Sequence, residues 1–395
     1  MREHERPAYD AVIVGARVAG AATALLLARF GLRVLLVDRG RLGADTMSTH
    51  ALMRGGVLQL SRWGLLDAVV AAGTPPVYRT TFRYADDVVP VAVKPSLGVA
   101  ALYAPRRTVL DPILVDAAAA AGADVRFGVA VADVSRDERG RVDGVVGRTR
   151  TGEVFRARAR FVVGADGIRS TVAERVRAPV ERIGSSVAAV TYGHWTGLET
   201  DGYEWNFRRD AASGVVPTNG GQACVYVSAS PRRIGRGGRE TLTRIVAESS
   251  PPLAERLAAA AAPAALRTFT GSRGRVRRSW GEGWALVGDA GYFKDPLTAH
   301  GQTDALRDAE LLARALFAAI AGDLPEHEAL AGYQRTRDEL SSTFFELTDV
   351  IAGHGWTDDE IQVLLRRLSA AMSDEVKTLS DLPPVPPAGR LVHCG

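Results

Sequence analysis

Lysine is nearly absent from this sequence of 395 residues. It occurs only at positions 94, 294 and 377, although lysine and arginine together number 49 and the formal net charge is +4. The arginines are scattered apart from a local group between 273 and 278, and no aromatic residues interleave with that group. Such a group is typical of a solvated face rather than of a nucleic-acid-binding surface. We therefore expect no nucleic-acid partner.

Cysteine is equally scarce. Cys224 and Cys394 stand far apart with no metal-ligand spacing, so we expect free thiols in a reducing compartment and no metal site. The stretch 1–9 has no apolar segment of the kind found in secretory signals. The longest apolar run, between residues 17 and 29, is shorter than the ~20 residues that cross a bilayer. These absences predict a cytoplasmic protein without an integral membrane segment.

The chain does contain the pattern of a βαβ unit near its start. Apolar residues make up 46% of the sequence, an ordinary globular proportion, and the length suits two or three domains. We predict a buried strand over 9–14, a helix of small residues over 19–30, and a second buried strand over 33–37 that Asp38 closes.

A glycine-rich turn joins the first strand to the helix. The turn reads Gly15-Ala16-Arg17-Val18-Ala19-Gly20. Gly15 and Gly20 occupy the first and third positions of the fingerprint that binds dinucleotides, but Arg17 stands where the second glycine is usual. An arginine there either crowds the pyrophosphate or neutralises it at the helix N-terminus. Asp38 stands where an acidic residue accepts hydrogen bonds from ribose hydroxyls, so the unit predicts a dinucleotide site.

Two further turns follow buried strands later in the chain. The strand ending at Val163 runs into Gly164-Ala165-Asp166-Gly167, and a helix begins near Ser170. The strand ending at Val287 runs into Gly288-Asp289-Ala290, and a helix follows Pro296 and Gly301. Each turn alone is common. In this order and at these separations, the three turns predict three walls of one dinucleotide site.

Two other regions have a different character. Prolines punctuate short alternating segments over 76–97, and the alternation over 179–269 is typical of antiparallel sheet with helical pieces near 240–248 and 253–260. The fold class expected is therefore α/β, with a Rossmann-like dinucleotide-binding domain, an inserted, mostly antiparallel substrate sheet and a helical C-terminus. We assign 1–75, 98–178 and 270–330 to the first domain, 76–97 and 179–269 to the second, and 331–395 to C-terminal helices and tail. Further helices are expected over 56–72, 110–121, 303–320, 328–353 and 358–376, and a strand over 125–131.

The three turns, with the segment 107–114, resemble the flavoprotein monooxygenase superfamily of the p-hydroxybenzoate hydroxylase type, to which geranylgeranyl reductases and flavin-dependent halogenases are also similar. The resemblance implies bound FAD, with Asp38 on the adenosine ribose and Arg107 along the ribityl-pyrophosphate stretch. It also implies that Asp166 serves both flavin and a passing nicotinamide cofactor, and that Asp289 holds the ribityl chain. The residues expected to bind the cofactor are Gly15, Arg17, Ala19, Gly20, Asp38, Arg39, Arg107, Asp166, Gly167, Gly288, Asp289, Pro296 and Gly301.

The sequence departs from the family pattern around the expected flavin ring. Tyr292, after Gly291, stands where the family usually has histidine, and the residues at 302–304 replace its usual asparagine. Lys294 and His300 fall close to the expected ring. His50, Tyr292 and His300 are the catalytic candidates for proton handling, with Lys294 as a further one. A purely structural role stays open for each of them, as a helix cap, a packing residue, a loop brace or a solvated lysine.

The resemblance implies an enzyme that takes hydride from NADPH or NADH and hydroxylates or epoxidises a medium-sized apolar or aromatic substrate through a flavin C4a-hydroperoxide. The aromatic segment 203–207 would either roof that substrate or pack in the core. A reductase of the geranylgeranyl type stays open, as does a non-redox binding protein of the GDP-dissociation-inhibitor type, because this fold does not fix function. No lysine lies between 167 and 288, which argues against a lysine-dependent halogenase. We expect a monomer or homodimer.

Overall fold

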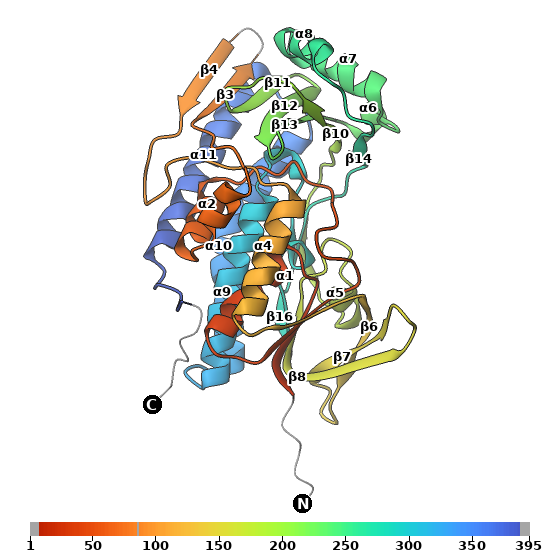
Figure 1. The fold of residues 1–395 in the computed structure, drawn as a ribbon, viewed down its shortest axis with the longest axis vertical. Coiled ribbons are helices and arrows are strands. Elements are labelled where there is room, and N and C mark those ends of the chain that lie inside the picture. The colour runs from red at the N-terminus through yellow and green to blue at the C-terminus, as the bar shows by residue number, and fades with distance from the viewer. Residues whose placement is uncertain (1–7, 85–86, 388–395) are drawn as a thin grey trace, which may run out of the picture.

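An eight-stranded sheet forms the centre of the molecule (Figure 1). The computed structural model describes residues 8–84 and 87–387. β1 (Tyr9–Val14) pairs in parallel with β2 (Val34–Asp38) on one side and β8 (Val154–Gly164) on the other. The last four residues of β1 are buried, as expected for a strand covered on both faces. The sheet continues with β5 (Asp124–Phe127) beside β2, and with β17 (Trp284–Leu286) and then β16 (Trp280–Gly281) beside β8. The prediction of an α/β fold built on a βαβ unit is confirmed.

The two faces of this sheet have different covers. On one face α1 (Val18–Arg29) packs between α4 (Arg107–Ala120) and α9 (Gly301–Ala321), as Figure 1 shows. On the other face β6 (Val129–Arg136) and β7 (Val142–Thr149) continue antiparallel from β8, and α5 (Thr171–Arg175) contacts β6. Alternate residues of β1 therefore belong to two apolar clusters, one on each face.

A second, seven-stranded sheet lies above the first in Figure 1, in the order β14-β10-β13-β12-β11-β3-β4. Its strands are β3 (Arg79–Tyr84), β4 (Asp87–Ala92), β10 (Ala189–Thr196), β11 (Tyr203–Arg208), β12 (Ala211–Thr218), β13 (Gln222–Ala229) and β14 (Arg267–Phe269). Only the β11–β3 pair is parallel, so the sheet is mostly antiparallel, as predicted.

Helices and a small sheet complete this upper region. One face of the seven-stranded sheet packs in a buried apolar cluster with three helices, which are α6 (Pro231–Ile234), α7 (Arg239–Ser249) and α8 (Pro251–Ala259). A three-stranded sheet consists of β9 (Val180–Ile183), β15 (Arg275–Arg277) and β18 (Tyr292–Phe293). Cys224 is buried as a free thiol, whereas Cys394 lies outside the described residues.

Two long helices follow, which confirms the predicted helical C-terminus. They are α10 (Glu326–Ala352) and α11 (Asp358–Asp381). A capping box starts α11, because the Thr357 hydroxyl accepts from the Glu360 amide while the Glu360 carboxylate accepts from the Thr357 amide at 2.8 Å. α11 packs against α10 and α2 (Arg54–Arg62) and reaches β11. Across the two described segments, no helix combines the length and apolarity needed to cross a membrane.

Two predicted elements are wrong in their extent. The helix expected over 56–72 is two helices, α2 and α3 (Leu66–Ala71), which are separated at Gly64. The strand expected over 125–131 is β5 and β6, which are separated at Gly128. Gly64 has a φ of +69° and Gly128 a φ of +77°. In both cases a glycine in the left-handed region, where other residues are strained, ends the regular element.

Candidate functional site: the edge of the central sheet

The three predicted turns lie side by side at one edge of the eight-stranded sheet. β8 pairs with both β1 and β17, so Gly164 is level with Val14 on one side and with Leu286 on the other. The Ala165 amide donates to the Val14 carbonyl at 2.8 Å, and the Val287 amide donates to the Gly164 carbonyl at 3.0 Å. Carboxyl ends of parallel strands are where α/β proteins bind their ligands. Motifs far apart in the sequence therefore form one surface.

Glycine is required where these turns meet α1. Gly15 has a φ of +107°, and a Cβ there would lie 2.4 Å from the carbonyl oxygen of Ala165. A Cβ at Gly20 would lie 1.8 Å from the carbonyl oxygen of Gly15. Gly288 has a φ of +60°, and its Cβ would lie 2.9 Å from that of Ala19. The start of α1 thus approaches all three turns too closely for any larger residue.

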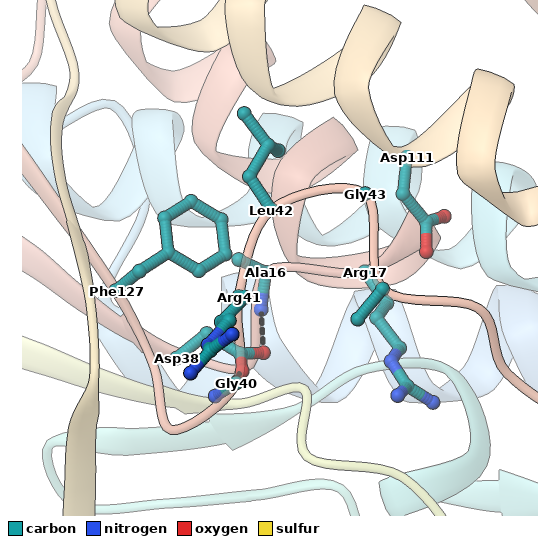
Figure 2. A pocket seen from close by; sticks show the side chains of 10 residues that line it. Ala16, Arg17, Asp38, Gly40, Arg41, Leu42, Gly43, Asp111 and Phe127 are labelled. Carbon is teal, nitrogen blue, oxygen red and sulfur yellow. Dashed lines mark hydrogen bonds between the residues drawn. The ribbon is translucent and has the colours of Figure 1, made fainter.

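Arg17 replaces the second fingerprint glycine without straining the turn. Its φ is −94° and its ψ −169°, an ordinary extended conformation, and it directly precedes α1. The exposed guanidinium donates to the hydroxyl of Thr46, so the side chain bridges the turn and the segment after β2. Figure 2 shows Arg17 and Asp38 on opposite sides of Ala16. The arginine therefore stands at the helix N-terminus, where phosphate groups bind.

Asp38, at the end of β2, binds the backbone of the first turn. Its carboxylate accepts from the amide of Ala16 at 2.8 Å, the bond drawn in Figure 2, and from the amide of Gly40 at 2.6 Å. Each carboxylate oxygen keeps a second lone pair, which leaves capacity for a ribose hydroxyl. The small cavity beside it is lined by Ala16, Arg17, Asp38, Gly40, Arg41, Leu42, Gly43, Ala44, Asp111 and Phe127. Arg39 is exposed. Sequence reasoning missed 41–44 and Phe127, because neither belongs to a motif.

Asp166 in the second turn is engaged with the start of α5. Its carboxylate accepts from the Ser170 hydroxyl at 2.5 Å and from the amides of Thr171 and Val172 at 2.6 and 3.2 Å. Burial raises the pKa of Asp166 above its usual value, and these hydrogen bonds oppose the rise. Gly167 has a φ of +78° with open space around its Cα. The contacts of Asp166 are those of a helix cap, and its role toward flavin and nicotinamide stays a prediction.

Asp289 in the third turn differs, because its carboxylate accepts no hydrogen bond from any residue of 8–84 or 87–387. The side chain is exposed, yet surrounding protein atoms raise the pKa of Asp289 to about 6, against the opposing charges of Lys294 and Arg107. The exposure and the raised pKa are compatible if solvent reaches the carboxylate of Asp289 from one side while protein atoms surround its other sides. Arg107 itself is buried and forms a bidentate pair with Asp111 at 2.9 Å. Asp289 is thus the acid with free acceptor capacity.

A buried network of charges anchors the loop after the third turn. Lys294 forms an ion pair with Asp304. Arg307 pairs with Asp304 at 3.0 Å and with Glu375 of α11 at 2.8 Å, and Nε2 of His300 lies 2.8 Å from the Glu375 carboxylate. The side chains of Arg307, His300 and Glu375 have no exposed surface. The loop that begins with η2 (Pro296–Thr298) and ends where Gly301 starts α9 is therefore fixed to α11.

Burial and charge set the protonation of this network. Burial alone favours neutral Glu375, but His300 and Arg307 outweigh it and hold the pKa of Glu375 at about 2. Burial lowers the pKa of His300 below its usual value and that of Lys294 to about 7. Near pH 7 a neutral His300 therefore donates its Nε2 hydrogen to an ionised Glu375. Nδ1 of His300 has no partner among the described residues.

The same network brings together three side chains that are able to bind a metal ion, one imidazole and two carboxylates. Atoms of His300, Asp304 and Glu375 lie within 4.8 Å of one another. Lys294 and Arg307 already compensate the two carboxylates at ion-pair distance. A metal ion would have to displace these cations, so the cluster is an ion-pair network.

His50 faces another histidine. Its Nε2 lies 2.9 Å from Nε2 of His194 on β10, so one ring donates a hydrogen bond to the other. Burial lowers the pKa of His50 well below 6.5 and that of His194 to about 4. Ser48, two residues before His50, accepts from Gln302 of α9 at 3.2 Å. The segment around His50 therefore links the upper sheet to the start of α9.

Tyr292 has the contacts of a packing residue. It is buried in a cluster with Val276 and Phe345, and its hydroxyl donates to the Ser341 carbonyl at 3.4 Å. Burial raises the pKa of Tyr292 above its usual value. These contacts favour the structural alternative for Tyr292, and its catalytic role stays a prediction.

A cavity of about 630 Å³ lies between the seven-stranded sheet and α11. Its wall on the sheet contains Phe82, Tyr84, Tyr203, Trp205 and Phe207, and its wall on α11 contains Leu365, Leu368 and Met372. Leu297, Thr298 and His300 of the anchored loop also line it. Its volume is in the range of small-molecule sites. Alternate residues of 203–207 thus face this cavity and also belong to a buried apolar cluster, so both sequence alternatives for this segment stay open.

The residues at the sheet edge fit an extended dinucleotide. At one end, Asp38 and the cavity beside it offer a ribose site, and Arg17 offers a cation at the start of α1. In the third turn, Asp289 offers uncommitted acceptors. Gly15, Gly20 and Gly288 add no side chain of their own to this surface.

Curated relatives include a reductase, a monooxygenase and a hydroxylase. Digeranylgeranylglycerophospholipid reductase 2 of Methanothermobacter thermautotrophicus is 27% identical in an alignment of 391 positions that covers 94% of each chain. The 2,4-dichlorophenol 6-monooxygenase of Delftia acidovorans is 28% identical over 44% of this chain and 32% of its own length. Aklavinone 12-hydroxylase RdmE of Streptomyces purpurascens is 33% identical over 50% of this chain and 37% of its own length.

Solved structures of similar fold include flavin enzymes. The flavin-dependent brominase Bmp2 superposes with a TM-score of 0.79 at 18% identity, covering 94% of this chain and 93% of that one. PqsL of P. aeruginosa, solved in complex with 2-aminobenzoylacetate, superposes with a TM-score of 0.75 at 23% identity, covering 92% and 99%. At these identities the likeness is one of fold. The model of the FAD binding domain family matches residues 8–347, so the chain belongs to that family and is an FAD-dependent oxidoreductase.

Proposed function

We propose that the enzyme is a cytoplasmic monooxygenase that uses NADPH or NADH to hydroxylate or epoxidise a medium-sized apolar or aromatic substrate. The observation that carries the proposal is the aromatic-walled cavity, which Leu297, Thr298 and His300 of the loop after β18 also line. The hydroxylases among the relatives support the same reaction class. Bound, reduced flavin would supply the electrons that activate dioxygen.

The chain's own residues would position the reactants and control water. The aromatic and aliphatic walls of the cavity exclude water from the substrate. His300 holds its Nε2 hydrogen toward Glu375 and leaves Nδ1 free as an acceptor. It is therefore the residue that we expect to hold a proton at the end of the cavity nearest the third turn.

A saturating reductase is the second candidate. The relative that matches over 94% of both chains is a digeranylgeranylglycerophospholipid reductase, whereas the two hydroxylases match over half of this chain or less. A reductase would use the same flavin site and cavity but would deliver hydride to an alkene. The two functions therefore differ in their dependence on oxygen.

The purified protein distinguishes these functions. We expect a yellow protein with the absorption bands of oxidised flavin, which NADPH or NADH reduces and dioxygen reoxidises. With a panel of phenolic and alkaloid-like compounds under ¹⁸O₂, we expect one labelled oxygen atom in the product. Substrate reduction that proceeds equally well without oxygen would replace this proposal by the reductase. A colourless protein that takes up no FAD would leave only the non-redox binding function.

We expect Arg17→Gly to weaken FAD binding about tenfold, because a hydrogen bond to a charged group contributes roughly 1.5–3 kcal/mol. The reason is the position of its guanidinium at the N-terminus of α1, beside the turn that approaches the pyrophosphate. Titration of the apoprotein with FAD measures the affinity, and Arg17→Lys, which keeps the charge, is the matched variant. Tighter binding of FAD to Arg17→Gly would show that the arginine obstructs the phosphates.

A further inference from the structure

The rim of the large cavity is cationic. Arg54, Lys94, Arg366 and Lys377 line it, so two of the three lysines in the sequence belong to this one site. Lys94, Arg366 and Lys377 are exposed, and none of them has a carboxylate partner at ion-pair distance among residues 8–84 and 87–387. Many other basic residues of the chain pair with acids, including the third lysine, Lys294, which pairs with Asp304.

No acid in the described lining compensates these charges. Glu375 is the carboxylate that lines the cavity, and its side chain has no exposed surface. It is already bound by Arg307 at 2.8 Å and by His300 at 2.8 Å. The cavity therefore presents a positive potential to an incoming ligand, and its apolar walls reduce the screening of that potential by water.

Three of the four cations gather at one end of the cavity. Arg54 donates to the carbonyl of Lys94 at 2.7 Å and to that of Val99 at 3.1 Å, which ties the loop after β4 to the first residue of α2. Lys377 lies in the last turns of α11, which packs beside α2 (Figure 1). Arg366 stands apart, near the hydroxyl of Tyr84 at the sheet. The charge is thus concentrated where α2 begins and α11 ends.

Most of the remaining lining is apolar, even where solvent reaches it. Val89, Val91 and Leu97 line the cavity and keep 42%, 43% and 51% of their surface exposed. Covering such side chains with an apolar ligand is favourable by roughly 25 cal/mol per Å². The site therefore combines an apolar chamber of about 630 Å³ with an anion-attracting end.

We propose that the substrate is an amphipathic anion, with an apolar or aromatic body in the chamber and a carboxylate, sulfonate or phosphate held by Lys94 and Lys377. Lysine suits this position because its compact ammonium attracts an anion that stays partly hydrated at the rim. The identification of this ligand as the substrate rests on the proposed function, whereas its binding does not.

Calorimetry on the FAD-loaded enzyme tests the binding with two matched probes. These are 1-anilinonaphthalene-8-sulfonate and N-phenyl-1-naphthylamine, which have the same aromatic body with and without the sulfonate. We expect the sulfonate to bind about tenfold more tightly, and Lys94→Gln/Lys377→Gln to remove this advantage while changing the affinity for the neutral probe less than about twofold. High salt should weaken binding of the sulfonate alone.

Arg367→Gln is the matched control, because Arg367 is exposed on α11 next to Arg366 but does not line the cavity. Equal affinity of the two probes, or an equal loss in Arg367→Gln, would overturn the proposal. Cosedimentation with phosphatidylglycerol vesicles but not with phosphatidylcholine vesicles, lost in the double variant, would identify the anion as a lipid headgroup. Retained sulfonate binding without cosedimentation would identify a free anion.

The same samples separate this proposal from the proposed function. The absorption spectrum and the NADPH-dependent reduction of the flavin report on the redox function and do not involve Lys94 or Lys377. A flavin that NADPH and NADH fail to reduce would contradict the monooxygenase even if the sulfonate binds as expected. Normal flavin reduction with no preference for the sulfonate would contradict only the amphipathic anion.

Discussion

Asp289→Ala will lower the affinity of the apoprotein for FAD by about tenfold to a hundredfold, because hydrogen bonds to a charged group contribute roughly 1.5–3 kcal/mol each. The carboxylate of Asp289 follows the buried strand β17 and accepts no hydrogen bond within the described segments. A ribityl hydroxyl can therefore donate to it without displacing a protein donor, and the loss of one such bond gives the expected change. Quenching of flavin fluorescence on titration with the apoprotein measures the change.

The pH dependence of FAD binding gives a second readout of the same carboxylate. Its surroundings raise the pKa of Asp289 to about 6, so FAD affinity should fall as the pH drops through 6 and the carboxylate loses its negative charge. The stability of the apoprotein should change in the opposite sense. A pKa raised from 3.8 means that the folded state binds the proton more tightly than the unfolded state, so stability falls as the pH rises from about 4 to 6. Both dependences should weaken in Asp289→Ala.

Glu282→Ala provides the control, since Glu282 is an exposed acid in the turn just before β17. It removes one negative charge from the same region without touching the third turn, and it should leave FAD affinity within about twofold. Unchanged FAD affinity in Asp289→Ala would mean that the third turn does not hold the ribityl chain.

The central sheet was predictable because its signals are local. The strand over 9–14, the turn at Gly15 and the helix after it are adjacent in sequence, and each needs only its own residues to be recognised. Even the meeting of three distant turns followed from parallel strands whose carboxyl ends share an edge. Arg17 shows the limit of motif matching, since the backbone there adopts an extended conformation that any residue accepts.

The side-chain networks around the site were not predictable, because their partners are distant in sequence. His50 and His194 are 144 residues apart, and His300 and Glu375 are 75 residues apart. Glu375 lies within the helix expected over 358–376, where an acid is usually on the solvated face. Its complete burial depends on Arg307, which α9 delivers from the other side. The burial of Glu375 beside Arg307 arises from the packing of α11 against the rest of the molecule, and no pattern in the sequence around Glu375 predicts it.

The fold alone also leaves the reaction open. Flavin-dependent brominases share the architecture at 18% identity, yet no lysine lies between 167 and 288 of this chain. Lys294 is instead paired with Asp304 in the loop after the third turn, and Lys94 and Lys377 line the cavity. The fold therefore does not fix the reaction, and the two lysines that line the cavity are where the specificity for substrate should be sought.

Arg307→Met will lower the free energy of unfolding by roughly 3–5 kcal/mol, because breaking a buried ion pair strands an uncompensated charge. Arg307 has no exposed surface and pairs with Asp308 at 2.7 Å, Glu375 at 2.8 Å and Asp304 at 3.0 Å. Methionine keeps much of the side-chain length but leaves Asp308 and Glu375 buried without their cation. Chemical unfolding of the apoprotein at pH 7 measures the loss.

Arg314→Met is the matched variant on the same helix. Arg314 pairs with Glu310 at 2.6 Å but keeps 22% of its side chain exposed, and Glu310 retains hydrogen bonds from Gln59 and Trp63. Its replacement should cost no more than about 1 kcal/mol. Equal losses in the two variants would show that the fully buried network adds nothing beyond a pair whose arginine reaches solvent.

Acid distinguishes the lost ion pairs from a simple packing defect. The pKa of Glu375 is held at about 2, below its usual 4.5, so its ionised form stabilises the native state above about pH 4.5 and this contribution disappears as the pH falls toward 2. Without Arg307, ionised Glu375 contributes less to the free energy of unfolding at neutral pH. The difference in stability between wild type and Arg307→Met should therefore narrow on acidification from pH 7 to pH 3. If the stability difference stays constant across this pH range, the loss comes from packing. In that case the ion pairs do not fix α11 to the loop after the third turn.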